Sequence, residues 1–451
     1  MTKKRFSKFG LSRRGVLQAS AGAAALPLFH IREVGAAGKV SIGFWDHWVP
    51  AGNVVMKKQV ERFQKKTNIA VQADFITSVG NKNLLTIAAE AQAGAGHDIE
   101  AFPTWEVHNH SDKLEPVDDV VKQLEGQYGA VNPVCSYLAQ VKGHWLAVPS
   151  SSGTQNKGPC GRISILKAHG FDPVAMYPAK SGIEMPGTKA WTMDEFLKQA
   201  ELAAKAGKPF GIGLGQTSDS VDSTGSFFAS FGAALIDPKG NINLQSEGVM
   251  AALEFGQKLV KFLPKDAVSY DDASNNRALI SGQGALIYNP PSAWAVAKQT
   301  APKIAADCWT FPPPVGPAGR FTSYLPYFWG IWQFSKAKPA AKELIAYLSQ
   351  RDNVEERANA VAGYDIPPFQ SMDNFKIWEE VEPPKGTVFN YPIRPDQHTT
   401  SHVACSYATP DIAVQIYNQG TESTMLAKLQ SGQSIKQVLA WAKNELEGFM
   451  H

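Results

Sequence analysis

The sequence lacks the signatures of several protein classes. It has only four cysteines, no two of them spaced as C-x-x-C, which gives no support to a zinc ribbon or to thioredoxin chemistry. Its 38 glycines and 29 prolines are spread along the chain, so it is neither collagen-like nor a low-complexity tail. A mean hydropathy of −0.21 argues against a multi-span membrane protein. With 451 residues, 44% of them apolar, the chain is long enough to form two lobes around buried cores.

Motifs of common enzyme classes are also absent. The patterns G-x-S-x-G, H-E-x-x-H and G-x-x-x-x-G-K-[ST] do not occur. Gly211–Gly215 lacks the third glycine of a dinucleotide loop, and a strand ending in a flexible turn is the better interpretation. His108 and His110 have no clear third ligand, which favours a solvated loop over a metal site. We therefore expect no catalytic residue, no cofactor and no metal.

Positive charge is concentrated at the N-terminus. The formal net charge is +3, from 44 basic and 41 acidic side chains. Residues 1–36 hold seven of the basic groups and one acidic group, so the remainder carries 37 basic and 40 acidic side chains. No long basic run remains, and the electrostatic pattern of nucleic-acid binding is missing. We expect no nucleic-acid partner.

Residues 1–36 have the organisation of an export signal. Met1–Arg14 is basic, Gly15–Ile31 carries no charged residue, and Val34–Ala36 offers small residues for cleavage. The segment Ser12–Gln18, with its paired arginines, resembles a twin-arginine signal. The uncharged stretch is shorter than the roughly 20 residues that span a bilayer. We expect a twin-arginine-type signal peptide over residues 1–36 and a periplasmic mature chain.

Export would place the cysteines in an oxidising compartment. Cys135, Cys160, Cys308 and Cys405 have spacings that allow up to two disulfides, and buried free thiols fit the sequence equally well. None lies near the cleavage site, which argues against a lipid-anchored form.

Strand patterns alternate with helical patterns along the mature chain. We expect strands at Val40–Trp45, Ile69–Phe75 and Ile99–Phe102, with helices between them. This alternation favours a parallel sheet with helices on its faces. Further strands are expected at Trp145–Pro149, Phe210–Leu214, Ala285–Tyr288 and Phe328–Phe334. Further helices are expected after a capping box at Thr192, over Ala341–Leu348 and over Ile435–Leu446.

Aromatic and polar side chains gather where predicted strands end. In open α/β sheets the ligand crevice lies outside the carboxyl ends of the strands. Aromatic rings beside carboxylates and amides there suit sugars, although each tryptophan could equally be core packing. These residues are Trp45, Asp46 and Trp48 after the first strand, Trp105 after the third, and Asn289, Trp294 and Trp329 further along.

Seven elements follow one another along residues 39–449 in the order of a known family pattern. They are Gly96–Ile99, Leu114–Asp119, Gly143–Pro149, Ala190–Phe196, Gly282–Leu286 with Trp294, Ala340–Leu348, and Gly363–Pro367 with the final helix. Together they resemble family 1 extracellular solute-binding proteins, the group of ABC-importer sugar receptors that includes maltose-binding protein. Two positions depart from the pattern: His97 stands where proline is usual, and Ser150–Gln155 replaces a tyrosine-rich segment.

The resemblance implies an α/β protein with the two-lobed periplasmic binding protein fold and a ligand cleft between lobes joined by hinge crossings. By analogy we place lobe one at residues 39–150 and 284–331, and lobe two at residues 151–283 and 332–451. It also implies a monomeric substrate-binding protein, not an enzyme, that captures a sugar or oligosaccharide by hinge closure and delivers it to a membrane permease.

The resemblance and the strand-end rule together suggest a ligand site. Aromatic rings would stack on the sugar, Asp46 and Asn289 would bond its hydroxyls, and Ser151 would lie near the hinge. The expected ligand-binding residues are Trp45, Asp46, Trp48, Trp105, Ser151, Asn289, Trp294, Trp329 and Tyr364.

Other ligands and one other class remain open. The same fold could bind a polyamine, glycerol phosphate or a metal chelate. Phosphate would favour clustered Arg or Lys, which the named loops lack, and a polyamine needs more acidic groups than Asp46 and Glu106 supply. A secreted glycosidase using Asp46 and Glu106 as paired carboxylates is the alternative from another class. The sequence does not separate a transport receptor from a chemoreceptor ligand carrier.

Overall fold

The computed structural model describes residues 38–176, 186–288, 292–380 and 399–450. The predicted signal peptide over residues 1–36 and the predicted ligand contact Asn289 lie outside the described residues, and both stay predictions. Within the described ranges, no helix is long and apolar enough to cross a membrane.

The first sheet begins with three parallel strands. β1 (Lys39–Trp45) lies between β2 (Ala70–Ile76) and β3 (Ile99–Pro103). Beyond β3 the sheet continues with β10 (Arg320–Ile331), which runs antiparallel to β3. The three parallel strands were expected from the sequence at these positions, and the structure confirms them.

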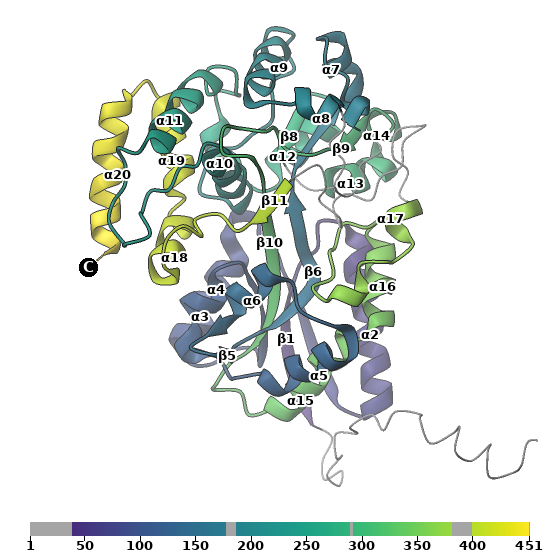
Figure 1. Ribbon diagram of the computed structural model, residues 1–451. Coiled ribbons are helices and arrows are strands. Elements are labelled where there is room, and N and C mark those ends of the chain that lie inside the picture. The colour runs from purple at the N-terminus through teal and green to yellow at the C-terminus, as the bar shows by residue number, and fades with distance from the viewer. Residues whose placement is uncertain (1–37, 177–185, 289–291, 381–398, 451) are drawn as a thin grey trace, which may run out of the picture. The chain divides into compact units, whose positions relative to one another are not determined.

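Amphipathic helices cover this sheet. In α2 (Pro50–Thr67), Met56, Val60 and Phe63 recur at helical spacing and are buried. Asn68 closes that helix in a left-handed conformation, with its backbone N–H donating to the carbonyl of Gln64. The other helices on or near this sheet are α3 (Lys82–Ala93), α4 (Glu106–Asn109), α5 (Asp118–Tyr128), α6 (Pro133–Ala139), α15 (Lys338–Leu348) and α16 (Arg351–Ala360), with the short ribbon of β4 (Gln140–Val141) and β5 (His144–Trp145) beside them. We call this part the first lobe (Figure 1).

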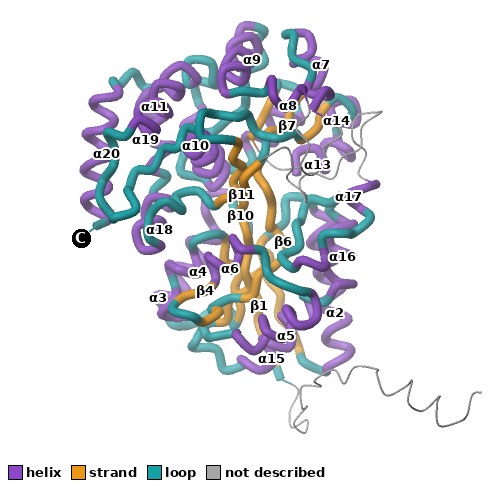
Figure 2. Tube along the Cα trace, viewed as in Figure 1, coloured by secondary structure: helices purple, strands orange, loops and turns teal. Residues whose placement is uncertain are grey.

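A second sheet has three short antiparallel strands. β7 (Pro159–Arg162) lies between β8 (Leu286–Tyr288) and β9 (Cys308–Thr310). This sheet, the helices around it and the helices that pack next to those form the second lobe (Figures 1 and 2). They are α7 (Ile163–Ala168), α8 (Pro186–Ala190), α9 (Met193–Lys205), α10 (Ser218–Ser230), α11 (Glu247–Leu259), α12 (Ser274–Ile280), α13 (Ser292–Thr300), α14 (Pro302–Ala305), α18 (Pro410–Asn418), α19 (Thr421–Gln430) and α20 (Ile435–Phe449). The short α17 (Ile377–Glu380) follows α16 along the chain.

Two long strands cross between the lobes. β6 (Val148–Lys157) pairs antiparallel with β10 over most of its length, and its register shifts between Leu325 and Tyr327. β10 pairs with β3 at its C-terminal end and with β11 (Thr399–His402) at its N-terminal end. β6 leads directly into β7 of the second sheet, and β10 follows β9 and returns the chain to the first sheet. β6 and β10 are therefore the strands that carry the chain between the two sheets (Figure 2).

The strand expected at Phe210–Leu214 is wrong: these residues are described but form no strand. Their backbone donors bond to separate segments, Gly211 to the carbonyl of Leu286 and Leu214 to that of Ala267. A hydrogen-bonded ladder with one partner therefore does not form.

The lobe boundaries stay a prediction, and the packing favours moving two of them. β8 and β9 fall in residues 284–331, predicted for lobe one, but they pair with β7. α15 and α16 fall in residues 332–451, predicted for lobe two, but they pack against α2. These contacts favour crossings within β6 and within β10, and a first lobe that includes α15 and α16.

The crossing strands leave space for only a glycine at one position. Gly153 in β6 has φ +88, and a Cβ there would lie 2.7 Å from Cδ2 of Tyr327 and 2.9 Å from Cε3 of Trp45. We expect Gly153→Ala to destabilise the fold by about 2–5 kcal/mol, from roughly 1–2 kcal/mol of backbone strain and roughly 1–3 kcal/mol of overpacking.

Urea unfolding of the two proteins measures this loss. The control is Gly126→Ala in α5, where a Cβ meets nothing within 4 Å in the described residues. This change should be neutral or stabilising by up to about 1 kcal/mol. Equal stability of Gly153→Ala and the unchanged chain would contradict the tight packing at the crossing.

Candidate functional site

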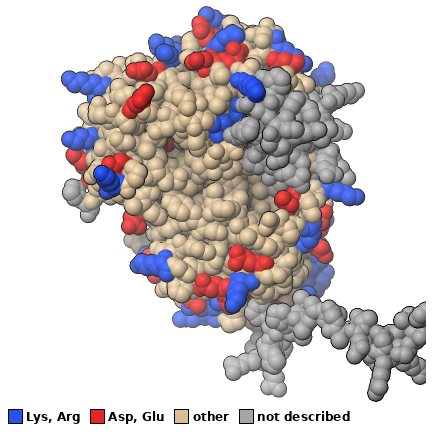
Figure 3. Space-filling model, in the orientation of Figure 1, with Lys and Arg blue, Asp and Glu red and all other residues tan. Residues whose placement is uncertain are grey.

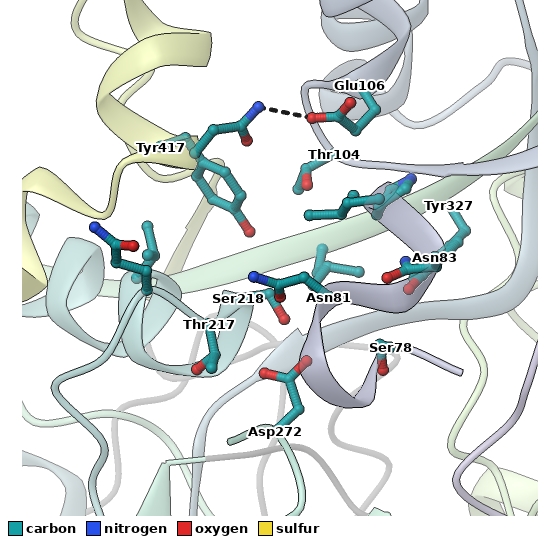
Figure 4. A pocket seen from close by; sticks show the side chains of 16 residues that line it. Ser78, Asn81, Asn83, Thr104, Glu106, Thr217, Ser218, Asp272, Tyr327 and Tyr417 are labelled. Atoms are coloured by element: carbon teal, nitrogen blue, oxygen red, sulfur yellow. Dashed lines mark hydrogen bonds between the residues drawn. The ribbon is translucent and has the colours of Figure 1, made fainter. Parts of the chain in front are cut away.

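A cleft with both polar and apolar lining residues lies beside β10, with walls from both lobes. The first lobe contributes the loops that follow β2 and β3, and the second lobe contributes the start of α10, the loop before α12 and the end of α18 (Figure 4). The lining side chains that can form hydrogen bonds to a ligand include Asn81, Thr104, Glu106, Thr217, Ser218, Asp272, Tyr327 and Tyr417. Hydroxyl, amide and carboxylate groups predominate among them. Among the described residues, no Lys or Arg lines the cleft.

The cleft is narrow in this conformation. Its cavity volume is about 50 Å³, enough for a few water molecules, whereas pockets for small-molecule ligands span roughly 300–1,000 Å³. Two hydrogen bonds join its walls: Asn418 Nδ2 donates to Glu106 Oε1 over 2.8 Å, and Trp105 Nε1 donates to the carbonyl of Ala404 over 3.0 Å. A ligand larger than water can enter only if the walls separate.

The first-lobe wall is built at the carboxyl ends of parallel strands, where open α/β sheets bind ligands. Thr104 follows β3 with φ +42, a left-handed conformation that is unusual for a β-branched residue. Its N–H donates to the carbonyl of Pro326 in the crossing strand, over 2.9 Å. Asn81 has φ +57, which asparagine tolerates better. Such strained backbone often marks a functional loop.

Buried charges lie behind the second-lobe wall. The ammonium of Lys157, at the end of β6, is 2.6 Å from Asp219 Oδ1 and 2.9 Å from Asp222 Oδ2. Burial alone would lower the pKa of Lys157, but the two aspartates outweigh it and raise that pKa. With Asp272 close by, one lysine faces three aspartates, and this group carries excess negative charge when all of them are ionised.

Asp272 is the member of this group that lines the cleft (Figure 4). Its side chain is buried, and its Oδ1 has no hydrogen-bond partner in the described part of the chain. Burial and the charge of Asp219 together raise the pKa of Asp272 to about 7, against the opposing effect of Lys157. A buried acceptor without a partner is ready to accept a hydrogen bond from a ligand.

An aromatic group packs next to the cleft. The Trp45 ring is 5.2 Å from that of Tyr327 and stacks on Tyr364 at 6.5 Å, measured between ring centroids. Trp45 Nε1 donates to Ser78 Oγ, which lines the cleft, over 3.4 Å. His47 packs on the same rings and forms a buried pair with Asp365, 3.0 Å apart. The rings therefore support the cleft wall from behind.

The structure brings only some of the predicted site residues together. Trp45, Trp48 and Tyr364 meet in or beside the aromatic group. Asp46 lies in the same loop as Trp45 but accepts a hydrogen bond from Asn53 over 2.6 Å. Trp105 is buried and holds the two walls together through Ala404.

The other predicted residues are spread through the molecule. Ser151 is buried in β6 and accepts a hydrogen bond from Arg357. Trp329 packs against Phe44 in the first-lobe core, and Trp294 packs on Trp309 with ring centroids 4.6 Å apart. None of the eight predicted residues that the structure describes is among those lining the cleft. Their role in ligand binding stays a prediction.

Sequence reasoning missed most of the residues that do line the cleft. Ser78 and Thr104 follow strands, so the rule that selected Trp45 and Trp105 could also have found them. Thr217 and Asp272 do not follow any strand of the described chain. They reach the cleft only through tertiary packing, for which the sequence holds no local signal.

The question of the cysteines is settled for the described chain. Cys135, Cys160, Cys308 and Cys405 are all buried and free. Burial raises the pKa of the Cys135 and Cys160 thiols to about 12, so these two cysteines behave as small apolar side chains.

The surface adds one more observation. On the face drawn in Figure 3, Lys, Arg, Asp and Glu side chains lie mainly around the margin, and the middle of that face carries few of them. A broad basic surface of the kind that binds nucleic acid is not visible on it.

Comparison with known proteins identifies a family and a fold. The family model described as bacterial extracellular solute-binding protein matches residues 58–383. A probable ABC transporter-binding protein of Deinococcus radiodurans is 27% identical over 150 residues, or 32% of this chain. The match spans about a third of that relative, 34% of its length.

Several solved structures share the fold. Maltose-bound MalE3 of T. maritima has a TM-score of 0.73 and 19% identity, covering 91% of this chain and 99% of that one. A solute-binding protein of Thermotoga lettingae bound with α-D-tagatose has a TM-score of 0.71 and 17% identity, covering 92% and 100%. A sugar transporter of Arthrobacter chlorophenolicus with laminaribiose has a TM-score of 0.70 and 15% identity, covering 91% and 99%. These likenesses confirm the predicted two-lobed periplasmic binding protein fold.

The raised pKa of Asp272 leads to a prediction about stability. Since the folded-state pKa lies above the ordinary value of about 3.9, the group favours folding at low pH, and this contribution is lost as the pH rises through about 7. Asp272→Asn should therefore raise the melting temperature at pH 8 relative to the unchanged chain, and the gain should vanish near pH 4.

Differential scanning calorimetry at pH 4, 6 and 8 measures this difference. Asp266→Asn, which removes an exposed carboxylate six residues earlier, is the matched control and should show no such trend. A gain for Asp272→Asn that does not change with pH would show that ionisation of the Asp272 carboxyl group does not destabilise the folded state.

Proposed function

The chain belongs to the family of bacterial extracellular solute-binding proteins, and on this premise we propose that it captures a sugar or oligosaccharide for an ABC importer. The observation that carries the proposal is the composition of the cleft. Tyrosine rings lie beside carboxylate, hydroxyl and amide groups from both lobes. Sugars present apolar C–H faces and many hydroxyls, and such a lining complements both.

The relatives support the same ligand class. The three similar structures hold maltose, α-D-tagatose and laminaribiose, and the curated relative is named as an ABC transporter-binding protein. On this basis we assign the chain a membrane permease as its partner. The twin-arginine-type signal predicted over residues 1–36 would deliver it, as a monomer, to the periplasm.

The mechanism follows from the crossing strands. The narrow cleft must open for a sugar to enter, and the paired strands β6 and β10 are the connection about which the lobes would turn. A sugar that bonds to both walls gains contacts only when they come together, so it shifts the population towards the closed state. The contacts between Glu106 and Asn418 and between Trp105 and Ala404 would re-form on closure.

Binding is favoured over hydrolysis by the position of the carboxylates. The glycosidase alternative needs Asp46 and Glu106 on either side of a scissile bond. Glu106 lines the cleft, but Asp46 does not, and its carboxylate is bonded to Asn53. We therefore propose that the chain has no enzymatic activity.

A polyamine is the second candidate ligand. Two carboxylates, Glu106 and Asp272, line the cleft. Behind Asp272, the single Lys157 is outnumbered by aspartates. Excess negative charge beside two tyrosine rings would also suit a flexible cation.

A thermal-shift screen distinguishes these ligands. The chain is stripped of bound ligand under mild denaturant, refolded and scanned against mono- and oligosaccharides, polyols, glycerol phosphate, putrescine and spermidine. A ligand that binds only the folded state raises the melting temperature by mass action. We expect a shift with one class of saccharide. Shifts with amines alone would favour the polyamine, and shifts with glycerol phosphate alone would contradict both.

Two charge-removing variants sharpen the result. Asp272→Asn and Glu106→Gln keep the size of each side chain but remove its negative charge. Each variant should therefore bind a sugar about ten-fold more weakly, which corresponds to the loss of one charge-assisted hydrogen bond of roughly 1.5 kcal/mol. A polyamine should lose far more, and its affinity should fall steeply with salt. Isothermal titration at two salt concentrations measures both effects, with Asp266→Asn as control. Unchanged binding in both variants would place the ligand outside this cleft.

A further inference from the structure

A second cluster of titratable groups lies at the other end of β3 from the cleft. His97 precedes β3 at its amino end, whereas Pro103 and Thr104 at its carboxyl end line the cleft. Around His97 converge Asp74 of β2, Glu90 of α3 and Glu100 of β3. The function proposed above uses none of these side chains.

The carboxylates converge on both nitrogens of one imidazole ring. His97 Nδ1 lies 2.6 Å from Glu90 Oε1 and 2.8 Å from Glu100 Oε1. His97 Nε2 lies 3.1 Å from Asp74 Oδ2. Nδ1 carries at most one hydrogen, so it cannot donate a good hydrogen bond to both glutamates at once.

The charges in the cluster do not balance. Three carboxylates face an imidazole that carries at most one positive charge. Glu100 is only 2% exposed, and its Oε1 contacts His97 Nδ1, whose single hydrogen it has to share with Glu90. A buried carboxylate that shares one imidazole hydrogen with a second carboxylate is stabilised either by its own proton or by a further cation.

The backbone leaves space for the two glutamates. A Cβ at Gly43 would lie 2.3 Å from Glu100 Oε1, and a Cβ at Gly96 would lie 2.3 Å from Cδ of Glu90. Gly96 also has φ +150, a conformation that favours glycine. The second oxygen of Glu90 accepts a hydrogen bond from Trp332 Nε1 over 3.2 Å, which fixes its direction.

We propose that Glu90, His97 and Glu100 bind a divalent transition-metal ion such as Zn²⁺. One atom of each, including Nδ1 of His97, lies within 4.8 Å of the others. Zinc binds imidazole nitrogen and carboxylate oxygen at about 2.0–2.2 Å, which sets its ligand atoms about 3.4 Å apart in a tetrahedron. To reach that spacing, Nδ1 of His97 and the two glutamate oxygens, now 2.6 and 2.8 Å from it, need to move apart by about 0.6–0.8 Å. The metal replaces the proton on Nδ1 and supplies the missing positive charge.

Asp74 orients the ring in this site. Its carboxylate accepts the hydrogen of Nε2, and this leaves Nδ1 free to bind the metal, in the usual carboxylate–histidine–metal arrangement. The cluster opens to a surface recess that is also lined by Lys39, Ser41, Gln72 and Asp98, and a water molecule could reach the fourth position from this recess. An imidazole among carboxylates favours zinc over calcium, which prefers oxygen ligands alone.

Metal titration of the chain tests the proposal. The protein is prepared without a histidine tag, stripped with a chelator, and titrated with zinc chloride against a chromophoric chelator at pH 7.5. We expect one tight site per chain and a rise in melting temperature with zinc. His97→Asn should weaken this site at least 100-fold, and Asp74→Asn by about 10–100-fold. His144→Asn, which alters an exposed histidine paired with a single carboxylate, should bind like the unchanged chain.

A cobalt spectrum and a second ligand variant keep the test decisive. Co²⁺ should give visible absorption bands that are lost in His97→Asn, and circular dichroism checks that each variant is folded. Should His97→Asn fail to fold, Glu90→Gln replaces it with the same expected loss. The absence of stoichiometric zinc binding in the unchanged chain, or unaltered binding in the ligand variants, overturns the proposal.

Discussion

The backbone pairing of β6 with β10 is the constraint on which the rest of the structure depends. These two strands join the sheets, because β10 continues the first sheet while β6 leads into the second. Their positions fix the groups that matter on both sides of the crossing. Tyr327 in β10 faces the cleft, Lys157 at the end of β6 anchors the buried charges, and Gly153 lets the aromatic group pack close to the backbone. The cleft is thus a consequence of how the chain crosses between lobes.

The buried charges connect this crossing to ligand recognition. Lys157 belongs to a crossing strand, yet it neutralises aspartates that stand behind the cleft wall. Asp272 remains only partly compensated, and its raised pKa is the electrostatic cost of that arrangement. A ligand that donates a hydrogen bond to its free oxygen would relieve this cost. The same site that weakens the fold at neutral pH therefore favours binding, as is common at functional sites.

The sequence predicted the periodic parts of the fold better than the site. The strands β1, β2 and β3 and the helices around them follow hydrophobic periodicity, which is local information. The N-terminal half of β10 was missed because Pro326 interrupts its pattern and its partners are distant. Of the tryptophans predicted for the site, Trp105 and Trp329 are buried, and their role in ligand binding stays a prediction. Asp272 and Thr217 reach the cleft only through the pairing of the crossing strands, which no local pattern encodes.

The central claim is that ligand binding closes the cleft about β6 and β10. Leu85 on α3 and Val268 in the second lobe are exposed, whereas the four natural cysteines are buried. Spin labels attached to Leu85→Cys and Val268→Cys in one chain therefore measure the distance between the two lobes. Double electron–electron resonance should be recorded with and without the saccharide that most raises the melting temperature. The account predicts that ligand shifts the label distances to a single shorter population. Distances that stay the same with saturating ligand would contradict it.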